Sequence, residues 1–230
     1  MMTNKKTIAL FPLKANSERV VGKNFKCFAG KPLFHWILDK LLTCDLIDQV
    51  VINTDAGDQL IKSGLELSAK ILVRRRKPDL CGDFVSMNSI IADDLANVEA
   101  ETYLMTHTTN PLLSVNTISQ AMFAYQKGIE SGKNDSLFAV NKFQTRFYRS
   151  DGSPVNHDPN NLIRTQDLEP WFEEKSNLYI FSRSSFMTTN ARIGSHPILF
   201  ETPRCESVDI DDQDSWDIAE AIALSHAHAE

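Results

Sequence analysis

Short β-rich apolar runs alternate with segments of helical periodicity along the first 128 residues of the chain. Each apolar run has about seven residues, which suits a strand, and each is followed by a helix-like segment. This order indicates a mostly parallel sheet, because parallel strands need a crossover connection. The expected fold is therefore α/β, a three-layer wound sheet with helices on both faces. The expected strands are 7–13, 49–55, 70–75 and 101–107, and the expected helices are 32–43, 57–69, 86–98 and 114–128.

The regular alternation of strand-like and helix-like segments ends in the second half of the chain. Residues 136–150 have strand character and lead into a turn rich in Gly, Pro and Asn, and strand character returns at 176–182. Residues 141–176 are therefore expected to leave the sheet as an inserted arm, of the kind used as a lid or a dimer contact. A short helix near 183–190, a strand at 196–201 and a helix at 213–229 follow, so that 1–230 is expected to form a single domain.

Net charge, apolar runs and cysteine positions argue against several classes of protein. The net charge of −6 argues against a nucleic-acid polymer as partner, since proteins that bind one usually carry a basic face. No apolar run approaches the ~18–20 residues of a membrane span, and the first residues lack a signal-peptide cleavage site. A cytoplasmic protein without a membrane partner is expected. The four cysteines are scattered, which indicates neither a disulfide framework nor a zinc site.

The charges are distributed unevenly between the two ends of the chain. Residues 1–31 hold seven Lys or Arg and one acidic residue, whereas residues 201–220 hold eight Asp or Glu and one Arg. Together these segments could hold a phosphorylated ligand and its metal, or they could be two unrelated solvated surfaces. In wound sheets ligands bind beyond the carboxyl ends of the strands, which gives the loops that begin at Leu13, Thr54, Arg76 and His107 a common location.

The loop after the first strand reads FPLKANSERVVGKN, residues 11–24, and carries Lys14, Arg19 and Lys23. Backbone N–H groups of such a loop can surround a polyphosphate while the cations neutralise its charge. The loop lacks the GxxxxGK[ST] spacing of a Walker A motif, and one glycine, Gly22, does not make a dinucleotide-binding fingerprint. On these residues alone, a phosphate-binding loop and a plain basic surface loop both remain open.

The acidic end contains VDIDD, in which Asp209 and Asp211 lie two residues apart in extended sequence. Alternate residues of an extended chain point the same way, so both carboxylates could face one cation. Magnesium is typically held by one or two carboxylates together with phosphate oxygens and waters. The alternative is an acidic loop before the last helix, and in either case Asp212 or Asp214 is expected to cap that helix.

The front loop resembles the nucleotide-binding signature of the acylneuraminate cytidylyltransferase family, P-A-R-x-x-S-K-R-x-P-x-K-N followed by G-K-P-L. The matching residues are Pro12, Ser17, Arg19, Lys23, Asn24, Gly30, Lys31, Pro32 and Leu33. One departure is Lys14 at the position of the family's early arginine, which keeps the charge and loses the bidentate fork. Further similar segments follow in order: VVINTD (50–55), RKPDLCGDFVSM (76–87), THTTNPLLS (106–114), RTQDLEP (164–170) and ESVDIDDQDSWDIAEA (206–221).

The resemblance implies a nucleotide-diphospho-sugar transferase fold of Rossmann-like type and an Mg²⁺-dependent cytidylyltransferase. Such an enzyme transfers CMP from CTP to the anomeric hydroxyl of a 2-keto-3-deoxy sugar acid, a sialic-acid-like nonulosonate, and releases pyrophosphate. It also implies a homodimer whose arm, 141–176, reaches the neighbour's site. The alternatives are a nucleotidyltransferase that uses another nucleoside triphosphate or acceptor, and a nucleotide-binding homologue without turnover.

Carried over residue by residue, the resemblance assigns catalysis to Lys23, Asp209 and Asp211, with the two aspartates as metal ligands. The nucleotide-binding residues that it implies are Leu13, Lys14, Ser17, Lys23, Asn24, Arg76 and Ser86. Ser86 has an alternative role as the N-cap of the helix that follows it. The expected sugar-binding residues are His107, Lys142, Arg164 and Tyr179, of which Lys142 is included for its place beside the arm. A structural role for His107 stays open.

Overall fold

The computed structural model describes residues 6–17, 19–66 and 68–227, and it confirms the expected order of strands and helices. The strands of the main sheet are β1 (Thr7–Leu13), β4 (Gln49–Thr54), β5 (Ile71–Arg75), β6 (Thr102–Met105), β7 (Ser136–Phe143), β8 (Trp171–Phe181) and β9 (Pro197–Glu201). The helices are α1 (Leu33–Thr43), α2 (Gly57–Lys62), α3 (Met87–Asn97), α4 (Val115–Glu130), α5 (Arg183–Thr189) and α6 (Gln213–Ala227). A small hairpin pairs β2 (Cys27–Phe28) with β3 (Lys31–Pro32).

The main sheet has seven strands in the order β5-β4-β1-β6-β8-β7-β9. Strand β1 pairs in parallel with β4 and β6, and β4 pairs in parallel with β5. Strand β8 runs antiparallel to both of its neighbours, β6 and β7, which makes the sheet mostly parallel. The order reverses between β1 and β6, and the crevice beyond their carboxyl ends is where wound sheets bind ligands.

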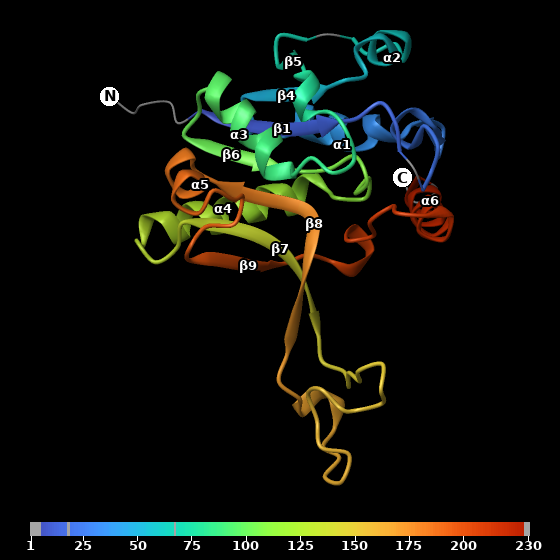
Figure 1. The fold of residues 1–230 in the computed structure, drawn as a ribbon, viewed down its shortest axis with the longest axis vertical. Coiled ribbons are helices and arrows are strands. Elements are labelled where there is room, and N and C mark those ends of the chain that lie inside the picture. The colour runs from blue at the N-terminus through green and yellow to red at the C-terminus, as the bar shows by residue number, and fades with distance from the viewer. Residues whose placement is uncertain (1–5, 18, 67, 228–230) are drawn as a thin grey trace.

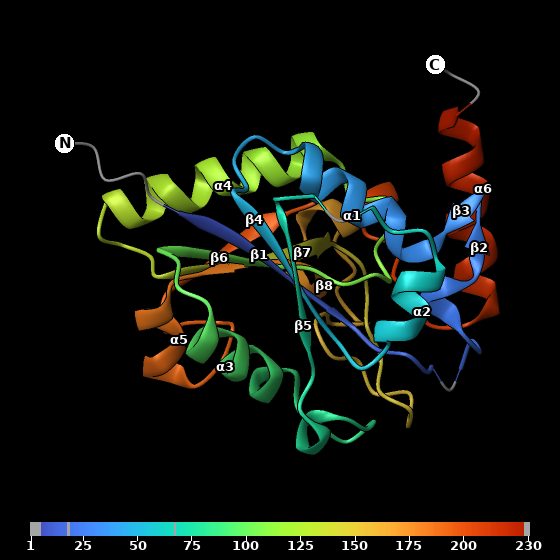
Figure 2. The ribbon, with the colours of Figure 1, turned by 90° about the horizontal axis from the view of Figure 1, so that it is seen from above.

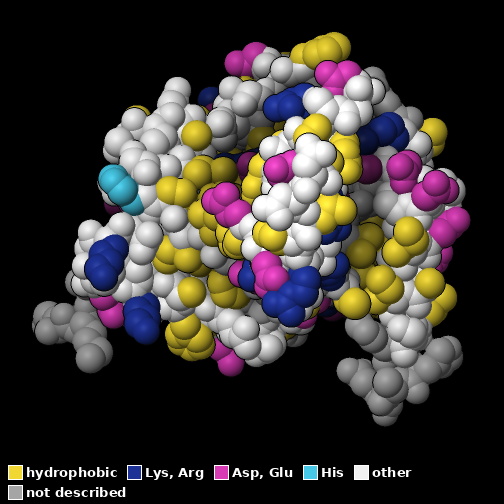
Figure 3. Space-filling view, turned by 90° about the horizontal axis from the view of Figure 1, so that it is seen from below, with side chains coloured by type: hydrophobic (Ala, Val, Ile, Leu, Met, Phe, Trp, Pro, Cys, Tyr) yellow, Lys and Arg dark blue, Asp and Glu magenta, His cyan; other side chains and the backbone are white. Residues whose placement is uncertain are grey.

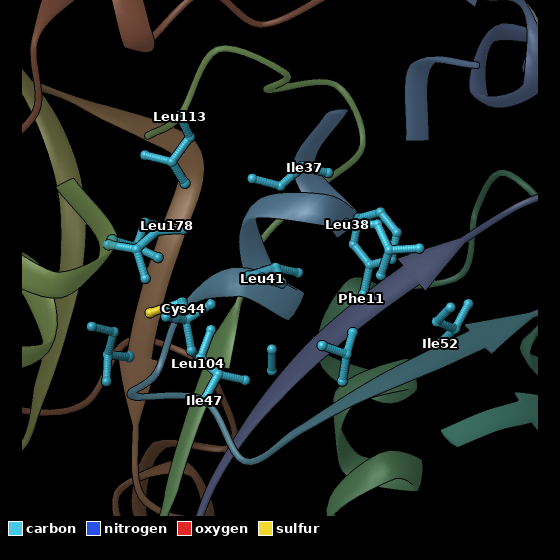
Figure 4. Packing of buried hydrophobic residues seen from close by; sticks show 14 of the residues in the cluster. Phe11, Ile37, Leu38, Leu41, Cys44, Ile47, Ile52, Leu104, Leu113 and Leu178 are labelled. Atoms are coloured by element: carbon cyan, nitrogen blue, oxygen red, sulfur yellow. The ribbon is translucent and has the colours of Figure 1, made fainter. Parts of the chain in front are cut away.

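Helices cover both faces of the sheet, as Figure 2 shows: α1 and α4 lie on one face and α3 and α5 on the other. The core between α1, α4 and the sheet includes Phe11, Leu38 and Leu104, which are fully buried (Figure 4). A second core under α3 and α5 contains Tyr103 and Phe181, whose rings stack with centroids 6.1 Å apart. Strand residues alternate between these two cores, which explains why β1 is apolar along its whole length.

A third apolar cluster joins the two ends of the chain. Trp216 of α6 is almost fully buried and packs edge-on against Phe28 of the small hairpin, with ring centroids 5.3 Å apart. Ile210 is fully buried in the same cluster. The Ala29 N–H also donates a hydrogen bond to the Glu220 carboxylate at 2.7 Å. The acidic stretch before α6 is therefore fixed beside the basic front loop.

Strands β7 and β8 continue past the edge of the other strands and carry an arm that projects from the body (Figure 1). The sequence placed strand character over 136–150 and 176–182, and both bounds were wrong. Strand β7 ends at Phe143 and β8 already begins at Trp171. The error has a physical reason: the first four residues of β8 are exposed, so they lack the alternation of burial that marks a strand inside the body.

The helix expected over 57–69 was also too long, because α2 ends at Lys62. Gly64 adopts the left-handed backbone conformation with φ of 76°, which ends the helical path. The other helices lie within two residues of their expected bounds, except that residues 228 and 229 of the last expected helix lie outside the described residues. All four cysteines are free thiols, as the sequence predicted. Within the described part of the chain, no helix is long and apolar enough to cross a membrane.

Candidate active site

Hydrogen bonds join the loops at the carboxyl ends of the parallel strands. The Ala15 N–H donates to the Asp55 carboxylate at 2.7 Å, which ties the loop after β1 to the loop after β4. The Asn24 amide donates to the Lys14 carbonyl at 2.7 Å and accepts from the Thr108 hydroxyl at 2.6 Å. Asn24 is thus a clamp between the front loop and the loop after β6. These loops share one location, as the sequence predicted.

Lys23 lies under the front loop and is almost completely buried. Its Nζ donates a hydrogen bond to the Ile210 carbonyl at 2.5 Å, so the lysine contacts the strand-like stretch that carries both aspartates. Burial lowers the pKa of Lys23, while the negative charges of Asp211 and Asp209 oppose that shift. The basic front of the chain and its acidic end therefore meet at this ammonium group.

Asp209 and Asp211 face one cavity, and Ile210 between them points into the core. This is the alternation that the sequence predicted. One oxygen of Asp209 accepts a hydrogen bond from the Ser176 hydroxyl at 2.6 Å. Its other oxygen is buried and has no hydrogen-bond partner among the residues that the structure describes. A buried carboxylate oxygen without a partner is costly, which indicates a place where a ligand binds.

Asp211 is more exposed and forms an ion pair with Arg19, at 2.8 Å between Nη2 and Oδ1. Arg19 comes from the front loop, so this pair also connects the two ends of the chain. Asp212 has a different role, because its carboxylate accepts from the Ser215 N–H at 2.8 Å and caps α6. The expected division between a facing pair and a capping aspartate is confirmed in its geometry.

Arg76 is anchored at the end of β5 by a neighbouring strand. Its Nε donates to the Asn53 side-chain oxygen at 3.0 Å, and its Nη2 donates to the Asn53 carbonyl at 2.8 Å. Asn53 is fully buried and its amide donates to the Asp94 carboxylate at 2.7 Å. Asp94 pairs in turn with Arg74. Burial lowers the pKa of Arg76, so this chain of contacts holds a desolvated cation in one orientation.

A cavity of about 730 Å³ opens beside the aspartate pair, between the base of the arm and the loop after α5. Tyr179 and Arg192 line it together with Asp209 and Asp211. The Arg192 guanidinium lies 3.9 Å from the centre of the Tyr179 ring. The Tyr179 hydroxyl donates to Glu174 at 2.6 Å, and burial raises the pKa of that hydroxyl. Tyr179 therefore supports the cavity wall and turns its hydroxyl to another side chain.

His107 lies half-buried just after β6. Burial and the positive charge of Arg192 together lower the pKa of His107 to about 4, while the negative charge of Asp209 opposes them. His107 is therefore neutral at pH 7 and can donate or accept a hydrogen bond through its ring nitrogens. Charges of both Arg192 and Asp209 thus act on His107.

Four further predicted nucleotide-binding residues are placed as follows. Lys14 is exposed and pairs with Asp83 at 2.9 Å, and Ser17 is half-buried in the same loop. Leu13 is fully buried in the core, so only its backbone borders the loop. Ser86 is exposed, and its hydroxyl accepts from the Asn88 N–H at 3.2 Å as the N-cap of α3. The capping role given to Ser86 as an alternative is confirmed.

Of the four predicted sugar-binding residues, Tyr179 lines this cavity, whereas His107, Lys142 and Arg164 do not. Asn141 and Phe143 line it, whereas Lys142 between them does not, because alternate residues of β7 face opposite sides. Arg164 lies on the projecting arm, exposed and paired with Asp167 through two contacts at 2.7 and 3.0 Å.

Sequence reasoning missed Arg192, Ser176 and Asn53. Arg192 lies in the loop between α5 and β9 and belongs to no motif, so no local signal could have found it. Asn53 lies inside the recognised segment VVINTD and Ser176 begins the strand expected at 176–182, but their roles depend on which side chain the neighbouring strand presents. Strand pairing between distant parts of the chain decides that, for example Met105 against Tyr179.

The comparison with known families agrees with this geometry. Residues 8–226 match the sequence profile of a family described as cytidylyltransferase. The chain belongs to the cytidylyltransferase family. A pseudaminic acid cytidylyltransferase of Campylobacter jejuni is 25% identical over 94% of this chain and 96% of its own length. A CMP-N,N'-diacetyllegionaminic acid synthase of Legionella pneumophila is 24% identical over 94% of this chain and 95% of its own length.

An N-acylneuraminate cytidylyltransferase of Oncorhynchus mykiss is 28% identical over 94% of this chain, which corresponds to 50% of the fish protein. Among solved structures, a CMP:2-keto-3-deoxy-manno-octonic acid synthetase in complex with CTP superposes with a TM-score of 0.67. It is 13% identical, and the match covers 96% of this chain and 99% of that one. A 4-diphosphocytidyl-2C-methyl-D-erythritol synthase of Anaerococcus prevotii gives the same TM-score at 12% identity. These two likenesses establish the wound nucleotidyltransferase fold.

Proposed function

We propose that this cytidylyltransferase transfers CMP from CTP to the anomeric hydroxyl of a 2-keto-3-deoxy sugar acid. The observation that carries the proposal is the position of Asp209. Its carboxylate borders both the buried Lys23 of the front loop and the 730 Å³ cavity, and one of its oxygens is buried without a partner. The sugar acids named in the relatives, pseudaminic, N-acylneuraminic and legionaminic, belong to this chemical class.

In the proposed reaction, the anomeric oxygen attacks the α-phosphorus of CTP. The bond from that phosphorus to the bridging oxygen breaks, pyrophosphate leaves with the electron pair, and the hydroxyl proton passes to water. Lys14, Lys23 and Arg76 would bind the phosphates and stabilise the leaving charge, since fixed cations act strongly where water is excluded. Asn24 and Thr108 would keep the front loop in the orientation that this requires.

Mg²⁺ is the proposed cofactor, and the donor set fits it. Asp209, which has one buried oxygen without a partner among the described residues, and Asp211 line one cavity, and hard oxygen ligands are those that Mg²⁺ prefers. Within the described residues, no group of three or more His, Cys, Asp or Glu gathers as a metal site. Substrate phosphate oxygens and waters would therefore complete the coordination. Bound there, Mg²⁺ would supply positive charge at the phosphate oxygens.

A homodimer is proposed from the arm. The arm exposes apolar side chains that its own body does not cover: Tyr148, Leu162, Ile163, Trp171 and Phe172. Figure 3, which views the molecule from the side toward which the arm projects, shows further hydrophobic side chains around its base. A second copy that covers these surfaces would remove them from water. Such a contact is also the only proposed route by which Arg164 would approach a sugar site.

The test is a pyrophosphate-release assay with Mg²⁺ and each of CTP, UTP, ATP and GTP. The acceptors are pseudaminic, N-acetylneuraminic, N,N'-diacetyllegionaminic and 2-keto-3-deoxy-manno-octonic acid. Release is expected only when CTP and one of these acids are both present. A preference for a purine nucleotide, or no release with any acid, would contradict the proposal. Binding of CTP without turnover, unaffected by Asp211→Ala, would favour a non-catalytic homologue.

A further inference from the structure

We propose that Arg192 is the residue of this chain that binds the carboxylate of the sugar acid. The inference rests on the proposed function and goes beyond it. It assigns the binding of the acid's negative charge to a residue outside the family motifs. A sugar acid brings one full negative charge into the cavity, and an anion in a partly enclosed site needs a cation with free hydrogen-bond donors.

Three cations line the cavity: Lys175, Arg192 and Arg204. Lys175 already pairs with Glu173 at 2.9 Å. Arg204 is exposed, and its Nη2 donates to a main-chain carbonyl of β7 at 3.2 Å. Arg192 and Lys175 are equally buried, with side chains 21% and 20% exposed, but the closest carboxylate to Arg192 among the described residues is 3.6 Å away, so Arg192 is the best placed of the three.

The guanidinium of Arg192 keeps donors available for a ligand. Its nearest carboxylate is Glu174, at 3.6 Å from Nη2, which is longer than a hydrogen bond. Nη1 contacts only the sulfur of Met105, at 3.9 Å. A guanidinium presents several N–H groups in a planar fork that matches a carboxylate. Arg192 can therefore make two charge-assisted hydrogen bonds without first breaking a strong one.

The orientation of this fork is set before any ligand arrives. The Tyr179 ring lies 3.9 Å from the guanidinium carbon, so the guanidinium packs against an aromatic surface. The Tyr179 hydroxyl is fixed in turn by its 2.6 Å hydrogen bond to Glu174. Stacking restrains the plane of the guanidinium, which reduces the side-chain entropy that binding would otherwise cost.

The backbone that carries Arg192 is also fixed. The Gly194 N–H donates to the Ser136 hydroxyl at 2.9 Å, and the next two N–H groups donate to the Asp135 carboxylate at 2.8 and 3.0 Å. A Cβ on Gly194 would lie 2.4 Å from an oxygen of Asp135, closer than atoms can approach. Glycine at this position lets the loop lie against Asp135. The loop holds Arg192 at the cavity wall.

The position of Arg192 suits the chemistry of the acceptor. In a 2-keto sugar acid the carboxylate is attached to the anomeric carbon, so the group that binds it must lie near the reacting oxygen. Arg192 and Asp209 line the same cavity and both act electrostatically on His107. Arg192 would thus hold the acid while its anomeric oxygen faces the aspartate side.

The test compares Arg192→Met and Arg192→Lys with the wild-type enzyme, using the best acceptor of the four-acid panel. Arg192→Met is expected to raise the KM for the acid about 10- to 150-fold, the loss typical of hydrogen bonds to a charged group, with the KM for CTP unchanged. Arg192→Lys is expected to restore part of the loss, because it keeps the charge without the fork. Lys175→Met is the matched control, since Lys175 is as buried as Arg192 but its ammonium group already pairs with Glu173 at 2.9 Å, and it should change the KM for the acid less than about threefold.

A second measurement starts from the wild-type enzyme, where it does not depend on how a variant folds. The carboxamide of the same acid should bind the wild-type enzyme at least about 10-fold more weakly than the acid, and this difference should vanish in Arg192→Met. Turnover by the wild-type enzyme with an unchanged KM in Arg192→Met, or equal binding of acid and amide by the wild-type enzyme, would overturn the assignment of Arg192 alone. No pyrophosphate release with any acid would overturn the proposed function and this assignment with it.

Discussion

The two halves of the site differ in how their cations are held. On the nucleotide side, Lys14 pairs with Asp83, and Arg76 donates twice to Asn53. On the sugar side, Arg192 lies on an aromatic ring, and the nearest carboxylate oxygen is 3.6 Å away. The proposed nucleotide side would therefore exchange contacts when phosphates bind, whereas the proposed sugar side offers donors that are already oriented. The exchange at Lys14 costs little, because both partners are about half exposed.

The largest effect is expected at Asp209, where the two halves meet. Asp209→Asn keeps the shape of the side chain and removes a negative charge that acts on the buried Lys23, and the carboxylate that it replaces has one buried oxygen without a partner among the described residues. We expect kcat for pyrophosphate release to fall by about 10³-fold or more, the scale of losing a major electrostatic contact in an active site.

The matched control for Asp209→Asn is Asp212→Asn, because Asp212 caps α6 and asparagine caps a helix equally well. This variant should keep wild-type kcat. Equal losses of kcat in the two variants would mean that the total negative charge of the loop matters. Asp209 would then have no special role between the two halves.

The next largest effect is expected at His107 on the sugar side. It is measured as a change in the free energy of unfolding with pH. Burial and the Arg192 charge lower the pKa of His107 to about 4, whereas the unfolded chain has a histidine pKa of about 6.5. Between these values the unfolded state binds the proton and the folded state does not. The free energy of unfolding should therefore keep the whole contribution of His107 above pH 6.5. It should fall by about 2–3 kcal/mol as the pH drops to about 4.

Denaturant unfolding of the wild-type protein and His107→Gln over pH 4–7 isolates this contribution, since other groups titrate in both proteins. The wild-type protein should lose stability relative to the variant as the pH falls. If the two curves stay parallel, His107 titrates normally and the sugar side is less enclosed than the contacts indicate.

A smaller effect is expected at Asn53, which positions Arg76 on the nucleotide side. Asn53→Leu removes the acceptor for Arg76 Nε and the donor to Asp94. We expect the KM for CTP to rise about 10-fold, as for the loss of one hydrogen bond to a charged group, with the KM for the sugar acid unchanged. Stability should fall as well, because Asp94 is left buried with one partner fewer.

Asn53→Asp is the useful companion variant, because it keeps an oxygen for Arg76 and loses the donor to Asp94. It should recover much of the CTP affinity while remaining destabilised. If the KM for CTP and the KM for the sugar acid rise together in these variants, Asn53 supports the whole site. The distinction between the two halves of the site would then fail.

The smallest effect is expected at Lys14, where the chain departs from the family's arginine. Lys14 is exposed and its ion pair with Asp83 lies at the surface, so Lys14→Arg keeps the charge in a setting where geometry matters little. The KM for CTP should change less than about threefold. An improvement of tenfold or more would show that this contact is geometrically specific, and that the nucleotide side is less adaptable than proposed.

The parts of this account that the sequence predicted rest on local patterns. Period and length predicted the order of strands and helices, and alternation predicted that Asp209 and Asp211 face one side while Ile210 faces the core. The cap roles of Ser86 and Asp212 followed from their place before helices. These features depend on neighbours within a few residues, so a single sequence contains them.

The parts that could not be predicted depend on contacts between distant segments. Arg192 reaches the cavity because β8 pairs with β6 and because Asp135 holds the loop after α5. Lys142 misses the cavity because of its register on β7, which sequence patterns leave open by one residue. The start of β8 was missed because its first four residues are exposed and therefore do not alternate between apolar and polar as a strand within the body does.

The most direct test of the central claim identifies the product. The protein is incubated with CTP, Mg²⁺ and each of the four sugar acids, and the mixture is analysed by mass spectrometry and phosphorus NMR. The account predicts one CMP conjugate of the acid for each pyrophosphate released, with the phosphate on the anomeric oxygen, and none with Asp209→Asn. Release of free CMP at the same rate without an acid, or a conjugate through another hydroxyl, would contradict it.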